Sequence, residues 1–327
     1  MSEASLFDRL KEGDINSCYQ YLDQASFGGE ALVKYLNTLL YYAISINWEN
    51  DIKDHPIILI NAIKNIIADS RDKPSKILLK YGIDILIEKK IRDDNEYLIN
   101  IEGSGPSSTV FVGSLEDAIQ GNDWEKAKRL TAKIFLVSDR SRAIIDTIAD
   151  IGLQNIESNA LFIFHILRAF HFKQKKSQVW SYACCLINVL KSKSLPVPHN
   201  KKDIDPDKLI DLISSYYDPE LLLKFAAISR IWNEGYVRER SYKREISNWL
   251  YKIKPSIKKN NIDLSKIAID QNLDYNNYIN IAERIISQES SFDNISKRIV
   301  ILEAIRYFSK IKPNKNLYFY INQINIS

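Results

Sequence analysis

Two of the chain's four histidines lie close together in the stretch FHILRAFH, residues 164 to 171. An imidazole group can bind a metal ion or move a proton near neutral pH. His165 and His171 are six residues apart, so on a helix they would point about 120° apart and lie about 9 Å apart along the axis. Two metal ligands on one helix need a spacing of three or four residues. The pair therefore cannot bind one ion from an unbroken helix, and we predict no metal site.

An internal repeat places the histidines opposite asparagines. The aligned stretches are HPIILINAIKNI (55–66) and NALFIFHILRAF (159–170). In this register His55 falls on Asn159 and Asn61 falls on His165, so each copy carries one His and one Asn in swapped order. If the two copies pack about a pseudo-twofold axis, we expect the four side chains to meet in one polar pocket.

That pocket has two interpretations. In one, His55 and His165 act as acid–base or ligand groups, with Asn61 and Asn159 beside them. In the other, they are core histidines satisfied by hydrogen bonds, and His55 begins a helix because it precedes Pro56. We favour the second, because buried polar groups are normally hydrogen-bonded to one another.

Further pairs of segments support the repeat. They are SLFDRLKEGDI (5–15) with SLEDAIQGNDW (114–124), the apolar stripe from Leu32 with that from Ile144, and SKILLKYGIDILI (75–87) with SQVWSYACCLINV (177–189). In the first pair, Asp14 and Asp123 each follow a Gly or Asn that would end one helix, so each is placed to cap the next helix. The order of the elements is kept, which predicts two copies of a helical unit of roughly 105 residues.

Composition favours an all-α fold. The chain has 327 residues, 45% of them apolar and 26% charged, with only 10 glycines and 9 prolines. So few turn-forming residues are typical of long helices, and apolar residues recur at helical spacing along most of the chain. The two short runs with strand character, TVFV (109–112) and YFYI (318–321), have no plausible partner nearby. We predict two tandem helical repeats packed together, followed by a C-terminal helical extension.

The repeat and two loop-like segments set the domain boundaries. IEGSGPSSTVFVG concentrates Gly, Ser and Pro but lacks the Lys-Ser/Thr pair of a phosphate-binding loop. KSLPVPHNKKDIDPDK carries three prolines and His199. The predicted parts are a first repeat unit (1–100), a linker (101–113), a second repeat unit (114–195) and a C-terminal helical region (208–327).

A basic, aromatic-rich stretch runs from Gly235 to Lys259. Its aromatic residues occupy an apolar helical stripe, whereas nucleic-acid stacking needs exposed rings. The net charge of +4 is small, because 45 basic residues nearly balance 41 acidic ones, and this does not favour nucleic-acid binding. Lys243, Arg244 and Lys252 lie on the other face. We favour a solvated basic helix face over an acidic protein partner, which would be bound by Arg238, Arg240, Lys243 and Arg244.

Several features favour a cytoplasmic protein without a membrane span. The three cysteines, two of them adjacent, make a poor disulfide framework. The N-terminal MSEASLFDRL has neither the basic nor the apolar region of a secretory signal. The longest apolar run, ALFIFHILRAF, is interrupted by His165 and Arg168 and is too short to cross a bilayer. The sequence identifies no cofactor.

The two helices that carry the histidines resemble those of the helical questin oxidase-like proteins. The resemblance rests on DHPIILINAIKNI, with an apolar run directly after His-Pro, and on NALFIFHILRAF, and it covers about residues 1–195. It implies an all-helical fold and, as in the fungal members, oxidative cleavage of an aromatic polyketide ring, with His55 and, less clearly, His165 as the histidines used. In some bacterial relatives this region is joined to a Rieske iron–sulfur domain. Here Asn159 stands where a second His would open the later helix, and the chain has no Cys-x-His pair.

Three functions of different kinds follow. The first is a non-catalytic cytoplasmic helical module that binds a partner protein or associates with itself, because nothing in the sequence completes a catalytic constellation. The second is a questin oxidase-like oxidoreductase whose pocket between the repeats uses His55 and His165. The third is nucleic-acid binding by the basic C-terminal helix.

Overall fold

Helices form nearly all of the secondary structure in this computed structural model, which describes residues 5–25, 27–103, 109–191, 195–200, 203–257, 277–288 and 291–326. Within these ranges there are 17 α-helices and no strands, so the predicted all-α class is confirmed. Ile46 and Ile91 form only an isolated antiparallel bridge. Short 3-10 helices lie between the α-helices: η1 (Ile52–Asp54), η2 (Lys176–Gln178), η3 (Pro206–Leu209) and η4 (Lys254–Ser256).

The first set of helices covers residues up to Gly103: α1 (Leu6–Glu12), α2 (Ile15–Gln24), α3 (Glu30–Ser45), α4 (Pro56–Ile67), α5 (Lys76–Leu86) and α6 (Asp94–Gly103). Local signals set their ends. Gly13 ends α1 in the left-handed region at φ 74°, and the Asp14 side chain then caps α2. His55 is the N-cap of α4, and Pro56 takes the first helical position, where its missing N–H costs nothing.

The second set comprises α7 (Val112–Gln120), α8 (Trp124–Val137), α9 (Ala143–Leu153), α10 (Ile156–Phe172) and α11 (Val179–Leu190). Asp123 caps α8 as predicted, and Asn122 before it has a left-handed φ of 58°. Ser114, which aligns with the N-cap Ser5 of α1, lies inside α7 instead. Residues 104–108 of the predicted linker lie outside the described part of the chain.

The two sets pack in corresponding ways. In the first, α1 packs on α2 and α3, α2 on α5, and α3 on α4 and α5. In the second, α7 packs on α8 and α9, α8 on α11, and α9 on α10 and α11. A duplicated unit would give this correspondence, and the duplication itself stays a prediction.

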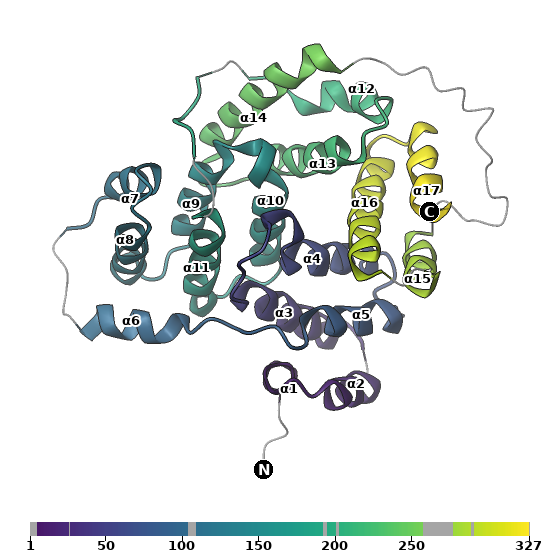
Figure 1. Ribbon diagram of the computed structural model, residues 1–327, viewed down its shortest axis with the longest axis horizontal. Helices are drawn as coiled ribbons and strands as arrows, with labels where there is room; N and C mark the ends of the chain where they lie inside the picture. The colour runs from purple at the N-terminus through teal and green to yellow at the C-terminus, as the bar shows by residue number, and fades with distance from the viewer. Residues whose placement is uncertain are drawn as a thin grey trace.

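Helices from three parts of the chain meet in the middle of the molecule (Figure 1). The C-terminal region comprises α12 (Ile210–Ser214), α13 (Pro219–Asn233), α14 (Glu239–Ile253), α15 (Tyr278–Gln288), α16 (Phe292–Ile311) and α17 (Asn316–Ile326). Helix α4 packs on α10 and α16, and α13 packs on the same two helices, so these four form a closed ring. The C-terminal helices are therefore part of the central packing and do not merely follow it.

The ring is held mainly by buried aromatic and aliphatic side chains. Phe164 of α10, Phe225 of α13 and Phe308 of α16 are at most 1% exposed, and the last two stack with centroids 5.8 Å apart. Burying a side chain of this size contributes about 1.5–3 kcal/mol of stability.

YFYI (318–321) lies in α17, consistent with its lack of a strand partner. Among the described helices, none combines the length and the apolar character that crossing a membrane requires.

Candidate functional site

The structure brings one predicted His–Asn pair together. Asn61 Nδ2 of α4 lies 2.9 Å from His165 Nδ1 of α10, and both side chains are 0% exposed. In this arrangement the asparagine donates to Nδ1, so the proton of the neutral ring is assigned to Nε2. His165 Nε2 and Asn61 Oδ1 have no hydrogen-bond partner in the described residues.

His55 and Asn159 make their contacts elsewhere. His55 Nδ1 accepts the Ile57 N–H at 3.1 Å, and its Nε2 lies 3.7 Å from Cys185 Sγ. The Asn159 amide donates to the Gly152 carbonyl at 2.9 Å. None of these bonds joins His55 or Asn159 to the Asn61–His165 pair, so the described contacts form separate groups and not one shared pocket.

Both buried histidines are held neutral. Burial, reinforced by the nearby Arg92 charge, lowers the pKa of His55 to about 3. Burial also lowers the pKa of His165 to about 3, with Glu303 opposing this effect and Arg230 adding to it. Because each residue is at most 1% exposed, a substrate would reach either ring only after packed helices had separated.

Next to His165 lies a buried charged cluster that the sequence did not single out. Glu303 of α16, 1% exposed, accepts two bonds from the Arg230 guanidinium of α13, at 2.6 and 3.0 Å. Asn65 of α4 donates to the same carboxylate at 2.9 Å. Burial alone would raise the pKa of Glu303, but Arg230 outweighs it and the pKa is lowered. The cluster therefore joins three helices of the central ring by charge-assisted bonds.

Lys64 adds a further buried charge to the ring. Its side chain is 5% exposed, and Nζ lies 4.9 Å from the centroid of the Phe172 ring. Burial, together with the Arg168 charge, lowers the pKa of Lys64 to about 7. No carboxylate lies within ion-pair distance of it in the part of the chain that is described, so its ammonium form is poorly compensated.

The predicted basic patch is largely paired with acids of the same chain. Arg238 bridges Glu116 at 2.7 Å and Asp150 at 3.2 Å, which ties the start of α14 to α7 and α9. Lys243 pairs with Glu239 one turn earlier at 2.5 Å, and Arg244 donates to Glu245. Of the four predicted side chains, only that of Arg240 is classed as exposed.

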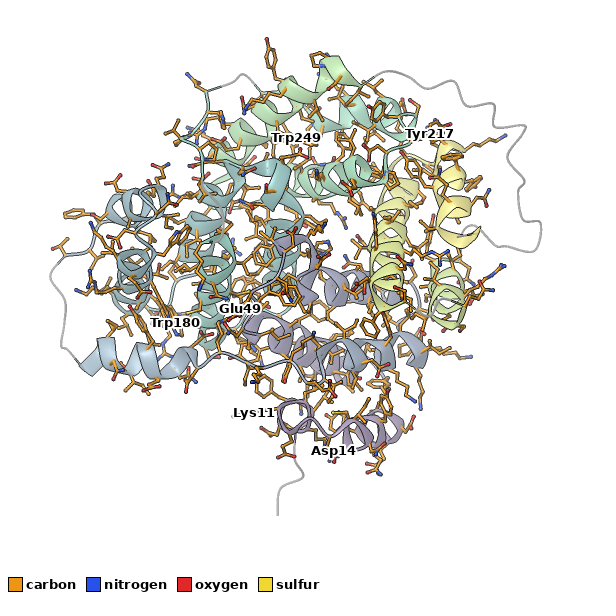
Figure 2. The ribbon with its side chains drawn as sticks, viewed as in Figure 1. Lys11, Asp14, Glu49, Trp180, Tyr217 and Trp249 are labelled. Atoms are coloured by element: carbon orange, nitrogen blue, oxygen red, sulfur yellow. The ribbon has the colours of Figure 1, made fainter. Side chains whose placement is uncertain are left out.

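A cleft of about 530 Å³ lies beside α14. The end of α9, the start of α10, the segment 195–200 and α14 surround it; Trp249 of α14 is labelled in Figure 2. Its lining residues are Gln154, Asn155, Ile156, Glu157, Pro196, His199, Glu245, Asn248, Trp249, Lys252 and Ile253. This volume lies in the range of small-ligand sites.

His199 and Glu245 form a fixed pair in the cleft. His199 Nδ1 lies 2.6 Å from Glu245 Oε2, and the His199 backbone N–H donates to Oε1 at 3.0 Å. Arg244 Nε donates to Oε1 at 3.0 Å as well. The Glu245 side chain is 1% exposed, so its carboxylate is used to hold the loop. The other ring nitrogen of His199, Nε2, does not contact Glu245.

Other polar groups of the cleft are less fully bonded. Asn248 is 6% exposed and has no hydrogen-bond partner in the described structure. Gln154, also 6% exposed, accepts from Gln120 at 3.4 Å through Oε1, which leaves its amide hydrogens available. Lys252 is exposed on the last turn of α14. These groups can donate hydrogen bonds to a bound molecule and fix its orientation.

Metal and thiol chemistry receive no support from the described residues. No group of three or more His, Cys, Asp or Glu side chains is arranged there to hold a metal ion. Cys18, Cys184 and Cys185 are buried free thiols. Burial raises the pKa of Cys185 to about 12, which keeps the thiol protonated and weakly nucleophilic.

The chain was compared with models of protein families, with curated proteins and with solved structures, and it matches none of them. The resemblance to questin oxidase-like proteins therefore stays a prediction.

Proposed function

We propose that this chain is a non-catalytic helical interaction module and that the cleft beside α14 is its recognition site. The observation that carries the proposal is the cleft itself, where three separate chain segments leave about 530 Å³ lined in part by polar side chains. One of them, Asn248, is 6% exposed and has no hydrogen-bond partner among the described residues. The Asn248 amide can therefore donate a hydrogen bond to a bound molecule and accept one from it.

The surroundings of the cleft support recognition. The pair of His199 and Glu245 holds the segment 195–200 against α14, so this wall is ordered before a partner arrives. Val197, between the lining residues Pro196 and His199, is 74% exposed. An exposed apolar side chain beside an ordered polar cleft suits a protein partner, which would bury both.

The histidine positions support the non-catalytic part of the proposal. His55 and His165 are neutral and at most 1% exposed, and their described nitrogen contacts are with groups of the protein itself. The oxidoreductase hypothesis would require the central ring of helices to open around them. The nucleic-acid hypothesis is weakened for a different reason. Acidic side chains of the same chain already pair with Arg238, Lys243 and Arg244.

Site-directed photo-crosslinking tests the proposal. A photoreactive amino acid replaces the exposed Val197 beside the cleft, and a control protein carries it at Lys175, an exposed lysine beyond the opposite end of α10. We expect a defined adduct from extracts of the source cells at position 197 and not at position 175. The captured protein, once purified, should bind the wild-type chain directly. Equal adducts at both positions, or none at 197, would contradict the proposal.

A further inference from the structure

The first turn of α10 faces the cleft. Asn155, Ile156 and Glu157 line it, and they are the N-cap and the first two residues of this 17-residue helix. The backbone N–H groups of a first turn have no acceptor within the helix. The Asn155 side chain accepts the N–H of Ser158, which leaves those of Ile156 and Glu157 to other acceptors. The positive end of the helix dipole therefore lies at the cleft.

A second, independent feature also provides donors. Asn248 is more than nine-tenths buried, lines the cleft and has no described hydrogen-bond partner. Lys252, one turn further along α14, lines the cleft and forms no ion pair with any described carboxylate. Gln154 contributes an amide whose hydrogens are free. Donors from α9, α10 and α14 thus surround one space.

The two carboxylates of the lining are already neutralised. Glu245 accepts bonds from His199 and Arg244. Glu157 is paired with Lys224 and accepts the Trp249 indole N–H at 3.0 Å. Burial alone would raise the pKa of Glu157, but Lys224 and Trp249 outweigh it and the pKa is lowered. Lys252 is thus the charged residue of the lining that lacks a described counter-ion. The cleft therefore suits an anion.

We propose that the cleft binds the phosphate group of a phosphate monoester; the inference concerns the proposed recognition site and rests on its being one. A phosphate monoester carries up to two negative charges and three terminal oxygens that accept several hydrogen bonds. That matches an ammonium, two side-chain amides and helix N-terminal N–H groups better than a carboxylate with two oxygens does. The cleft volume exceeds that of a phosphate alone and leaves room for its carrier.

Isothermal titration calorimetry on the full chain tests the inference. The probes are inorganic phosphate, AMP against adenosine, and a capped phosphoserine peptide against its serine counterpart. The variants are Lys252→Ala and Asn248→Asp, with Lys175→Ala as the matched control. Asn248→Asp keeps the side-chain shape, replaces the donor amide and has no described hydrogen bond to lose, so its fold is checked simply by circular dichroism.

We expect at least one phosphorylated probe to bind at least about tenfold more tightly than its counterpart without phosphate. Each cleft variant should remove most of this preference, and Lys175→Ala should keep it. Binding of the peptide alone would identify a phosphorylated partner protein as the source, and binding of AMP alone would identify a free phosphorylated compound. Equal binding with and without phosphate, unchanged binding in both cleft variants, or no binding of any phosphorylated probe would overturn the inference. The crosslinking result at position 197 tests the recognition site separately.

Discussion

Asn61 and His165 are 104 positions apart in the chain, yet Asn61 Nδ2 and His165 Nδ1 lie 2.9 Å apart in the buried centre of the molecule. The contact joins α4 to α10, two neighbours in the central ring of helices. A hydrogen bond at full burial restricts which helix faces can meet, because any other rotation would bury both polar groups unpaired. We therefore interpret this pair as a structural device that fixes the packing of the two helices.

The first prediction concerns this pair. Asn61→Leu leaves the ring nitrogen of His165 buried without its donor, and this should lower the free energy of unfolding by about 1–3 kcal/mol. The double variant Asn61→Leu/His165→Leu removes both polar groups, so it should be less destabilised than the sum of the two single variants. Urea denaturation of the four proteins measures the coupling. Strictly additive effects would show that the two residues do not stabilise each other.

The buried histidines also predict sensitivity to acid. Below the ordinary pKa of 6.5 the unfolded chain protonates His55 and His165, whereas the folded chain keeps them neutral down to about pH 3. The unfolded state therefore binds more protons, and the free energy of unfolding should fall as the pH drops from 6.5 toward 3. Each histidine contributes at most about 1.4 kcal/mol per pH unit. Urea denaturation at pH 7 and pH 5 should show a smaller loss in His165→Gln than in the wild type; equal losses would count against a neutral His165.

The lowered pKa of Lys64 predicts a change in the free energy of unfolding on the alkaline side of the pH range. Its pKa is about 7 in the folded chain and 10.5 ordinarily, so the unfolded state binds the extra proton between these values. The free energy of unfolding should rise with pH from 7 to 10.5, by at most about 1.4 kcal/mol per unit. Lys64→Met removes the buried charge, so it should stabilise the protein at pH 7 and flatten this rise. The exposed Lys175→Met should do neither. A less stable Lys64→Met protein at pH 7 would refute the interpretation.

The buried ion pair of Arg230 and Glu303 predicts that a substitution of one partner strongly lowers the free energy of unfolding. Glu303→Gln keeps the shape of the side chain but leaves the guanidinium of Arg230 buried without its counter-charge. Breaking one partner of a buried pair costs about 3–5 kcal/mol. The comparison is Glu239→Gln, which disrupts an exposed pair with Lys243 and should change the free energy of unfolding much less. Similar values for the two variants, measured by denaturation, would mean that the buried pair contributes little.

Much of the fold could be predicted from the sequence because the signals are local. Helical spacing of apolar residues and the scarcity of glycine led to the all-α class. The caps at Asp14 and Asp123 depend only on the residues around them, and both are present. The insertion of α13 and α16 beside α4 and α10 was not predicted, because it depends on long-range packing that no local pattern encodes.

The candidate site was harder to predict. The pairing of Asn61 with His165 could be anticipated from the repeat, but the separate contacts of His55 and Asn159 depend on how the two units are rotated against each other. Glu245 was missed, although it occupies the apolar stripe of its helix between Tyr242 and Trp249. A charged residue on an apolar stripe signals a buried partner, and here that partner comes from a loop 46 residues earlier.

The affinity of the partner captured by crosslinking at position 197 tests the central claim most directly. The binding of the purified partner is measured for the wild-type chain, for the cleft variant Lys252→Glu and for the control Lys175→Glu, which makes the same change in charge at the far end of α10. If the cleft is the recognition site, Lys252→Glu should weaken binding at least about tenfold, which corresponds to about 1.4 kcal/mol, and the control should bind like the wild type. Equal affinities for all three proteins would contradict the account.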